Sequence, residues 1–234
     1  MKISIIIPCY NEEKRIVKTL EKIKRFIKKR KEKFEIIVVD DGSKDKTIEI
    51  VKNFNSKIKL IENEKNFGKG ASIRNGMKAS KGDISLFMDA DSSTEISELE
   101  KFLPYFKEYD VIIGSRALSQ SEVIVPQGVI RRNIGFLAHK LIDLVLQTDI
   151  KDTTCGFKAF NKKSRGILFT KQLNNGWGFD YEIIFLINKL GFKLKQVPVI
   201  WKNDSASKVT FRGYLKSLIE LFMIRLNDLK GRYN

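Results

Sequence analysis

The chain has 234 residues, of which 42% are hydrophobic and 31% are charged, a balance typical of a folded soluble domain that excludes wholesale disorder. Its net charge of +16 suits nucleic acid, an anionic membrane surface or phosphate-bearing substrates, although a lysine-rich surface also favours solubility. Because no zinc-finger spacing or aromatic RNA-binding segment accompanies this charge, we expect no nucleic-acid partner.

Strand-like runs alternate with helical stretches through the first half of the chain. The five runs are Lys2–Ile7, Glu35–Val39, Ile58–Ile61, Ile84–Met88 and Val111–Gly114. Apolar residues at helical spacing lie between them. This alternation predicts βαβ units with right-handed crossovers, and therefore an α/β fold with a mostly parallel sheet flanked by helices.

The alternation weakens in the second half. Leu118–Gly128 is expected to be a polar loop, and Val129–Gln147 a long amphipathic helix. The later elements are expected to be a turn from Asp152 into a short strand, a loop and helix over Trp177–Leu190, a strand over Phe192–Trp201 and a helix over Gly213–Lys230. Pro198 places the last strand near a sheet edge, because proline cannot donate to a ladder.

Carboxylates follow three of the predicted strands. Glu12 follows the first strand, Asp40 and Asp41 the second, and Asp89 and Asp91 the fourth. Ligands of open α/β sheets bind beyond the carboxyl ends of the strands, so these carboxylates are expected to converge at one edge. Asp89-Ala90-Asp91 alone is a weak signal, because acidic surface turns also produce this pattern.

The residue types at this edge suit a nucleoside diphosphate. Paired carboxylates fit a hard divalent cation, Mg²⁺ or Mn²⁺, which bridges a diphosphate and neutralises its charge. Glu12 or Asp41 can accept a hydrogen bond from a nucleobase, and Tyr10 can stack on the base. The chain has no Walker A motif, which argues against an ATPase.

Four motifs in order resemble those of inverting family 2 glycosyltransferases with the GT-A fold. They are Ile5-Ile6-Ile7-Pro8-Cys9-Tyr10-Asn11-Glu12, Val38-Val39-Asp40-Asp41-Gly42-Ser43, Asn66-Phe67-Gly68-Lys69-Gly70 and Asp89-Ala90-Asp91. The resemblance implies a single Rossmann-like GT-A domain over residues 1–234, with C-terminal amphipathic helices at a membrane interface. It places the nucleotide-sugar donor in residues 1–115 and the metal on Asp89 and Asp91. The donor-binding residues that it implies are Pro8, Tyr10, Glu12, Val39, Asp41, Lys69, Asp89 and Ala90.

Motifs in the second half resemble the polyprenyl-phosphate branch of this family, which comprises the dolichyl-phosphate mannose and glucose synthases. They are Gly114-Ser115-Arg116, Arg131-Arg132 and Asp152-Thr153-Thr154-Cys155-Gly156-Phe157-Lys158, with Ser207-Lys208 near the end. Gln127-Gly128 and Phe179-Asp180-Tyr181-Glu182 are closer to the dolichyl-phosphate β-glucosyltransferases.

This second resemblance implies an acceptor-binding half over residues 116–234. The residues implied to bind the acceptor phosphate are Arg116, Arg131, Arg132, Ser207 and Lys208. Arg116 and Arg131 would be catalytic beside Asp89 and Asp91. One departure is Ser93 at the family's third metal position, which leaves the remaining metal ligands open.

The expected activity is metal-dependent transfer of glucose from UDP-glucose to a polyprenyl (dolichyl-type) phosphate. Mannosyl or N-acetylhexosaminyl transfer, to a lipid phosphate or to a glycan hydroxyl, is an alternative. Another is a module that binds an anionic polymer through the positive charge. Several residues keep structural alternatives: Lys69 in a plain turn, Arg116 and Arg131 as surface cations, and Asp152 as a turn initiator.

The expected location is cytoplasmic, peripheral on the cytoplasmic face of a membrane, with an anionic membrane surface as a partner. No apolar run approaches the ~20 residues that span a bilayer, and the chain starts with a strand-like run rather than a signal peptide. Cys9 and Cys155 have no metal spacing and need no disulfide. Cys155 is expected to be a small core residue rather than a nucleophile.

Overall fold

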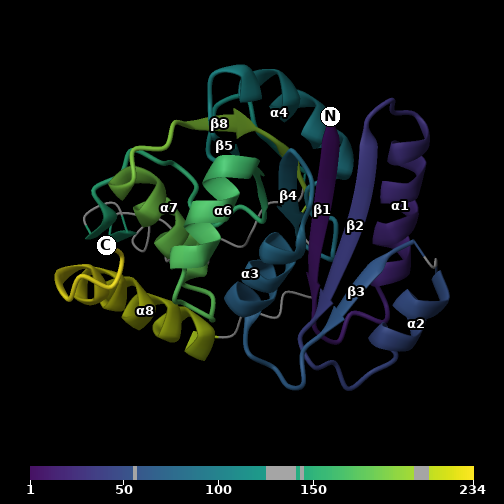
Figure 1. The fold of residues 1–234 in the computed structure, drawn as a ribbon, viewed down its shortest axis with the longest axis horizontal. Helices are drawn as coiled ribbons and strands as arrows, with labels where there is room; N and C mark the ends of the chain where they lie inside the picture. Colours follow the sequence, from purple (N-terminus) through teal and green to yellow (C-terminus); the bar gives the residue numbers. More distant parts are fainter. Residues whose placement is uncertain (55–56, 125–140, 143–144, 203–210) are drawn as a thin grey trace.

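A seven-stranded sheet crosses the molecule (Figure 1). The computed structural model describes residues 1–54, 57–124, 141–142, 145–202 and 211–234. The strands, in their order across the sheet, are β3 (Lys59–Glu62), β2 (Lys33–Asp40), β1 (Lys2–Cys9), β4 (Ile84–Met88), β7 (Phe157–Asn161), β5 (Val111–Ser115) and β8 (Leu194–Pro198). Two short strands, β6 (Glu122–Val123) and β9 (Ile200–Trp201), pair separately.

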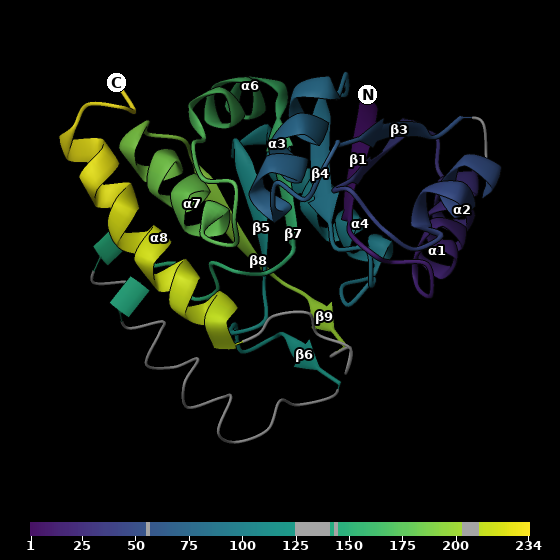
Figure 2. The same ribbon diagram turned by 90° about the horizontal axis from the view of Figure 1, so that it is seen from below.

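Helices cover both faces of the sheet, so the strands between them are apolar on both sides (Figures 1 and 2). One face carries α1 (Ile16–Lys28), α2 (Thr47–Phe54) and α4 (Leu99–Phe102), the last flanked by 3₁₀ turns at Ile96–Glu98 and Leu103–Lys107. The other face carries α3 (Lys69–Ala79), α6 (Lys162–Lys171) and α7 (Phe179–Lys189), and α8 (Phe211–Leu229) packs against α7. Every residue of β4 and β5 is buried as a result.

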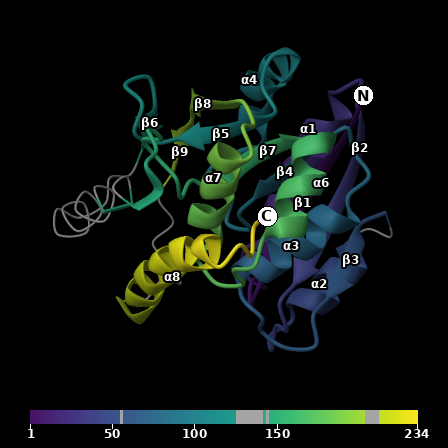
Figure 3. The same cartoon turned by 60° about the vertical axis from the view of Figure 1, so that its left-hand side comes forward.

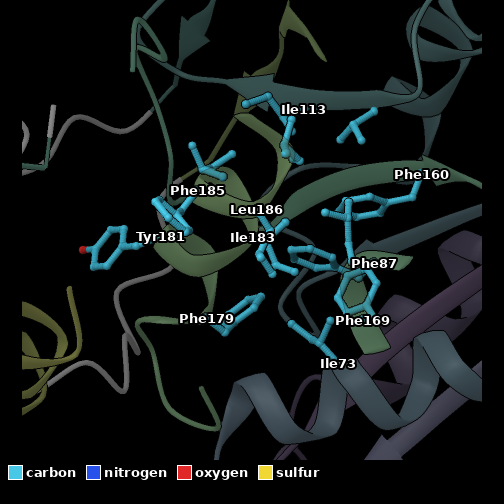
Figure 4. Packing of buried hydrophobic residues seen from close by; sticks show 14 of the residues in the cluster. Ile73, Phe87, Ile113, Phe160, Phe169, Phe179, Tyr181, Ile183, Phe185 and Leu186 are labelled. Atoms are coloured by element: carbon cyan, nitrogen blue, oxygen red, sulfur yellow. The ribbon is translucent and has the colours of Figure 1, made fainter. Parts of the chain in front are cut away.

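An aromatic cluster joins the middle of the sheet to α7 (Figure 4). Phe87 of β4 stacks on Phe160 of β7 with ring centroids 6.5 Å apart. It also meets the edge of Phe179, the first residue of α7, at 5.8 Å. Phe87 lies two residues before Asp89, so this packing fixes the strand that delivers the paired carboxylates.

Strand β7 runs antiparallel to both of its neighbours, β4 and β5, whereas all other neighbours in the main sheet are parallel. Phe157, at the start of β7, is therefore the partner of Met88, at the end of β4. The loop before β7 reaches the same edge as the ends of the parallel strands. Residues from the second half of the sequence thereby enter the site built by the first half.

The five strands expected in the first half are confirmed, as are the mostly parallel sheet and the position of Pro198 on an edge strand. The strand expected over Phe192–Trp201 is divided into β8 and β9. Helix α6 was not predicted, because only Ser164, Leu168 and Phe169 of its residues are buried and its apolar pattern is weak. The predicted helix over Val129–Gln147 lies largely outside the described residues. In the described part of the chain, no helix has the length and hydropathy needed to cross a membrane.

Candidate active site

The expected convergence of strand-end carboxylates is present. Glu12, Asp41, Asp89 and Asp91 follow β1, β2 and β4, which are adjacent and parallel, and Asp40 is the last residue of β2. Their side chains lie beyond the carboxyl ends of these strands, where open α/β sheets bind ligands.

Asp89 lies against the backbone of the loop that precedes β7. Its backbone N–H donates to the carbonyl oxygen of Gly156 at 3.2 Å. A Cβ atom added to Gly156 would lie 1.9 Å from Asp89 Oδ2, closer than any real contact. Only glycine at position 156 leaves room for the carboxylate in its present orientation.

Asp91 is held by the turn that follows it. Its Oδ1 accepts from the backbone N–H of Ser93 at 2.9 Å. Burial raises the pKa of Asp91, and the nearby negative charge of Asp89 raises it further. Thr19 of α1 supports the same turn by donating its hydroxyl to the carbonyl oxygen of Ala90 at 2.6 Å. The two carboxylates thus lie on a rigid turn, with their charges close together.

This pair fits a divalent cation that also binds phosphate oxygens. Within the described residues no group of three or more His, Cys, Asp or Glu side chains could hold a metal unaided. Mg²⁺ is commonly bound by one or two carboxylates together with substrate phosphates. Asp89 and Asp91 provide that donor set, and the cradle formed by Gly156 orients the first of them.

Lys69 is the first residue of α3 and forms an ion pair with Asp89, with Nζ 2.6 Å from Oδ1. Its ammonium group also lies 5.2 Å from the ring centre of Trp177 and 5.9 Å from that of Phe179. Burial lowers the pKa of Lys69, but the carboxylates of Asp89 and Asp180 outweigh it, and the pKa is raised. The structure therefore brings Lys69 to Asp89, and its predicted contact with a nucleotide-sugar stays a prediction.

A second ion pair, between Lys158 of β7 and Asp180 of α7, is buried behind the first. Lys158 also donates to the carbonyl oxygen of Cys155 at 2.9 Å. Burial raises the pKa of Asp180, and the charges of Lys158 and Lys69 oppose the shift. Both residues belong to motifs named above, and no role was predicted for either. A lysine in the apolar run Phe157–Phe160 was the available signal.

A groove with a volume of about 530 Å³ lies beside Lys69. One wall is the loop Asn66–Lys69, and the other is the loop Asn174–Trp177, which packs against Glu220 of α8. Glu220 Oε2 accepts from the backbone N–H of Gly178 at 2.6 Å. Glu182, buried in α7, accepts from the backbone N–H groups of Leu173 and Asn174. The groove combines an indole ring, amides and charged groups next to the paired carboxylates.

The residues expected to bind the nucleoside surround the ends of β1 and β2. Pro8 and Val39 are partners in the parallel register, and Tyr10 follows β1 directly. Glu12 is paired with Arg15, whose Nε and Nη2 lie 2.6 Å and 2.8 Å from its two oxygens. Contacts of these side chains with a base stay a prediction.

The two aspartates after β2 differ in their surroundings. Asp41 accepts from the backbone N–H groups of Phe67 and Gly68 at 3.0 Å and 2.8 Å, and so shapes the loop that carries Lys69. Asp40 accepts from the backbone N–H of Ser43 through Oδ2, while its buried Oδ1 has no donor among the described residues. Asp40 is fully buried, whereas Asp41 is 3% exposed, and the contact of either with a base stays a prediction.

Arg116 follows β5 and is anchored to Asp152. Its Nε and Nη2 each lie 2.7 Å from a carboxylate oxygen of Asp152, and Nη2 also donates to Thr154 Oγ1 at 2.9 Å. Burial acts to raise the pKa of Asp152, but attraction to Arg116 outweighs it and lowers the pKa to about 2. The guanidinium group also lies 5.3 Å from the ring centre of Trp201. Arg116 is therefore a positioned cation, and Asp152 is its partner.

Burial raises the pKa of the Cys155 thiol to about 12, as expected for an unreactive core residue. Four further predicted site residues, Arg131, Arg132, Ser207 and Lys208, lie outside the described residues, as does the Gln127-Gly128 segment.

Strand-end carboxylates on a mostly parallel sheet, with cations placed around them, are typical of enzymes that act on phosphate-bearing substrates. The model of the family Glycosyl transferase family 2 matches residues 4–166. A dolichyl-phosphate beta-glucosyltransferase of Trichomonas vaginalis is 35% identical over 99% of this chain and 75% of its own length. The dolichyl-phosphate beta-glucosyltransferase of Homo sapiens is 30% identical over 99% of this chain and 77% of its own. The chain belongs to glycosyltransferase family 2.

Solved structures share the GT-A fold with this chain. Mannosyl-3-phosphoglycerate synthase from Rubrobacter xylanophilus has a TM-score of 0.74 and 17% identity, over 99% of this chain and 75% of its own. Glucosyl-3-phosphoglycerate synthase from Mycobacterium tuberculosis, in complex with Mn²⁺, UDP and glucosyl-3-phosphoglycerate, has a TM-score of 0.69 and 18% identity. The match covers 97% of this chain and 79% of that one. At these identities the likeness concerns the fold alone.

The contact between Gly156 and Asp89 leads to the first prediction. In Gly156→Ala the added methyl group forces the Asp89 carboxylate to turn away, and the backbone adopts no positive φ that alanine would resist. We expect the variant to fold with a melting temperature near that of the wild type. Its affinity for Mn²⁺ should fall by about tenfold or more, the usual range for disturbed support of a metal ligand.

Gly166→Ala in α6 is the matched control, because a Cβ atom there would meet no other atom within 4 Å. Titration of each folded variant with Mn²⁺, followed by electron paramagnetic resonance, is the measurement. A folded Gly156→Ala variant with wild-type Mn²⁺ affinity would contradict the role given to Asp89.

Proposed function

We propose that this chain transfers glucose from UDP-glucose to a polyprenyl phosphate of the dolichyl type, with inversion at the anomeric carbon. The observation that carries the proposal is the match, over nearly the whole chain, to dolichyl-phosphate beta-glucosyltransferases. The arrangement of charges at the strand ends supports it independently, because the reaction brings two phosphate-bearing molecules together.

The donor belongs to the half of the chain formed by residues 1–115. The uridine would lie over the ends of β1 and β2, near Tyr10 and Glu12, and the diphosphate would lie between the Asp89–Asp91 turn and Lys69. Mg²⁺ or Mn²⁺ on the two aspartates supplies charge neutralisation for the departing diphosphate. The glucosyl unit would extend toward the groove beside Trp177, where an indole ring and amides offer suitable contacts.

The acceptor belongs to residues 116–234, with Arg116 as the described cation that would bind its phosphate. A phosphate monoester has a second pKa near ~6 and is largely anionic at neutral pH, so no general base is required. Asp180, near the Lys69–Asp89 pair, is buried and paired with Lys158. This pairing makes Asp180 a poor general base, and a phosphate acceptor needs none.

Turnover with a panel of donors tests this function. We expect UDP-glucose, dolichyl phosphate and Mg²⁺ or Mn²⁺ to give dolichyl-phosphate glucose, and chelation of the metal to stop the reaction. The measurement is product formation from UDP-glucose, UDP-N-acetylglucosamine and GDP-mannose in parallel. Preferred transfer from GDP-mannose, or transfer to a glycan hydroxyl but not to the lipid phosphate, would refute the proposal.

Arg116 should act on the acceptor and not on the donor. Replacement by alanine would leave the buried Asp152 unpaired and destabilise the fold by about 3–5 kcal/mol, so Arg116→Lys is the better probe. Lysine keeps the charge and loses the planar fork. The kcat/KM for dolichyl phosphate should fall about ten- to hundredfold, while the Kd for UDP-glucose stays unchanged.

Initial rates at varied dolichyl phosphate, together with calorimetry of UDP-glucose, measure these two effects. Arg30→Lys is the control, because Arg30 pairs with Glu32 and Glu100 on the surface, away from the strand ends. Weaker UDP-glucose binding in Arg116→Lys, with an unchanged response to dolichyl phosphate, would move Arg116 to the donor side.

The C-terminal helix is suited to a membrane surface, where a polyprenyl acceptor resides. Figure 3 shows α8 on the outer side of α7, away from β1 and β2. Five large apolar side chains on it are exposed at helical spacing: Ile219, Phe222, Met223, Leu226 and Leu229. Lys216 and Lys230 are exposed near the two ends of this stripe. The combination favours peripheral binding to an anionic membrane, which we assign to the cytoplasmic face.

Binding to lipid vesicles tests the role of α8. Phe222, 54% exposed, should enter the lipid interface, so Phe222→Glu should weaken binding to phosphatidylserine-containing vesicles by about tenfold or more. Ile167→Glu is the control, because Ile167 is an exposed apolar residue of α6. Co-sedimentation with vesicles of phosphatidylcholine, with and without phosphatidylserine, is the measurement. Equal binding by both variants and the wild type would exclude α8 as the membrane contact.

A further inference from the structure

Lys69 is bound to a carboxylate that the donor's metal would also need. Its Nζ lies 2.6 Å from Asp89 Oδ1, and the Lys69 and Asp89 side chains are 16% and 34% exposed. A divalent cation and a lysine ammonium cannot both occupy the same face of one carboxylate, because like charges repel. Asp89 Oδ2 lies against Gly156, so a cation that binds through Oδ1 requires Lys69 to leave that oxygen.

The charged groups around Lys69 show which of the two lysines in the site can exchange its carboxylate partner. Lys69 experiences the negative charges of Asp89, Asp91 and Asp180. Asp180 already has the buried Lys158, which is held in place by the carbonyl oxygen of Cys155. Lys158 is fully buried and cannot take part in an exchange at the surface of the site. Lys69 is the cation in this group that can change its partner.

The side chain of Lys69 can move without a change in the backbone. A lysine ammonium is a point charge on a flexible four-carbon chain, so a rotation of the side chain can carry it to a new partner. Lys69 lies at the side of the groove, over the rings of Trp177 and Phe179. The faces of these rings attract a cation, so they would continue to stabilise the ammonium group after it leaves Asp89.

We propose that Lys69 is an exchangeable counter-ion of the active site. It pairs with Asp89 before the donor binds, and it moves to the diphosphate oxygens when a divalent cation takes over the carboxylate. This inference rests on the proposed function only in requiring a nucleoside diphosphate as the donor's binding group. No covalent bond changes in the exchange, and the site is never left with two unpaired carboxylates or an unpaired ammonium.

The exchange makes the metal and the nucleotide bind cooperatively. Without nucleotide, the cation must displace Lys69 from Asp89, so its apparent affinity is reduced by the fraction of molecules in which the pair is open. A diphosphate offers Lys69 a new partner and removes this penalty. By reciprocity, the cation raises the affinity for the diphosphate by the same factor.

Lys69→Met tests the exchange, because methionine keeps most of the side-chain volume and removes the charge. We expect the affinity for Mn²⁺ alone to rise about tenfold, since nothing competes for Asp89. In the presence of Mn²⁺, the affinity for UDP should fall about tenfold, since the diphosphate loses its cation. Opposite changes in the two affinities would separate the exchange from structural damage, which lowers both.

Two variants serve as controls. Lys65→Met removes a lysine of the same loop that lies over Phe67, and it should leave both affinities unchanged. Lys69→Arg retains a positive charge and should keep Mn²⁺ affinity near that of the wild type. Electron paramagnetic resonance measures bound Mn²⁺, and calorimetry measures UDP at saturating and at zero Mn²⁺.

An Mn²⁺ affinity that is unchanged or lower in Lys69→Met would overturn the proposal, as would an unchanged UDP affinity. Neither measurement involves sugar transfer. Failure of the glucosyl transfer assay with normal UDP and Mn²⁺ binding would therefore refute the proposed function and leave the exchange intact. Normal transfer with no change in Mn²⁺ affinity would refute the exchange alone.

Discussion

The buried ion pair between Lys158 and Asp180 is the interaction on which the site depends. It joins β7, the antiparallel strand, to the start of α7, and it lies directly behind Lys69 and Asp89. Removing one member of such a pair leaves an uncompensated buried charge and typically costs about 3–5 kcal/mol. The pair therefore constrains two things together: the loop that carries Gly156 beneath Asp89, and the loop whose Trp177 borders the groove.

Donor and acceptor sides share a support at the small sheet of β6 and β9. Thr94, just beyond the Asp89–Asp91 turn, forms an isolated bridge with Trp201 of β9, and the backbone N–H of Lys202 donates to the carbonyl oxygen of Ser93 at 2.8 Å. The ring of Trp201 also lies under the guanidinium group of Arg116. A displacement of the Asp89–Asp91 turn is thus transmitted through β9 to Arg116, the cation proposed to bind the acceptor. The coupling needs no direct contact between the two substrates.

The features that sequence predicted correctly are local ones. A strand and the carboxylates at its end occupy about ten consecutive residues. The local sequence pattern therefore predicted the paired aspartates and the parallel strands of the first half. Pairings between distant segments were not. Asp152 lies 36 residues from Arg116, and a turn initiator and a functional acid look the same in sequence. The antiparallel insertion of β7 and the partner of Lys158 were also hidden, because no local periodicity encodes which strand becomes the neighbour of which.

Tyr233 stabilises the groove wall through hydrogen bonds to residues that are distant in the sequence. Its hydroxyl donates to Glu182 Oε1 at 2.5 Å, and Lys171 donates to its carbonyl oxygen at 2.9 Å. Glu182 in turn holds the backbone N–H groups of Leu173 and Asn174 at the groove wall. In protein engineering, a truncation that removes Tyr233 would therefore release the groove wall from this contact. Asn234, the next residue, is exposed, so a substitution there should leave the contact undisturbed.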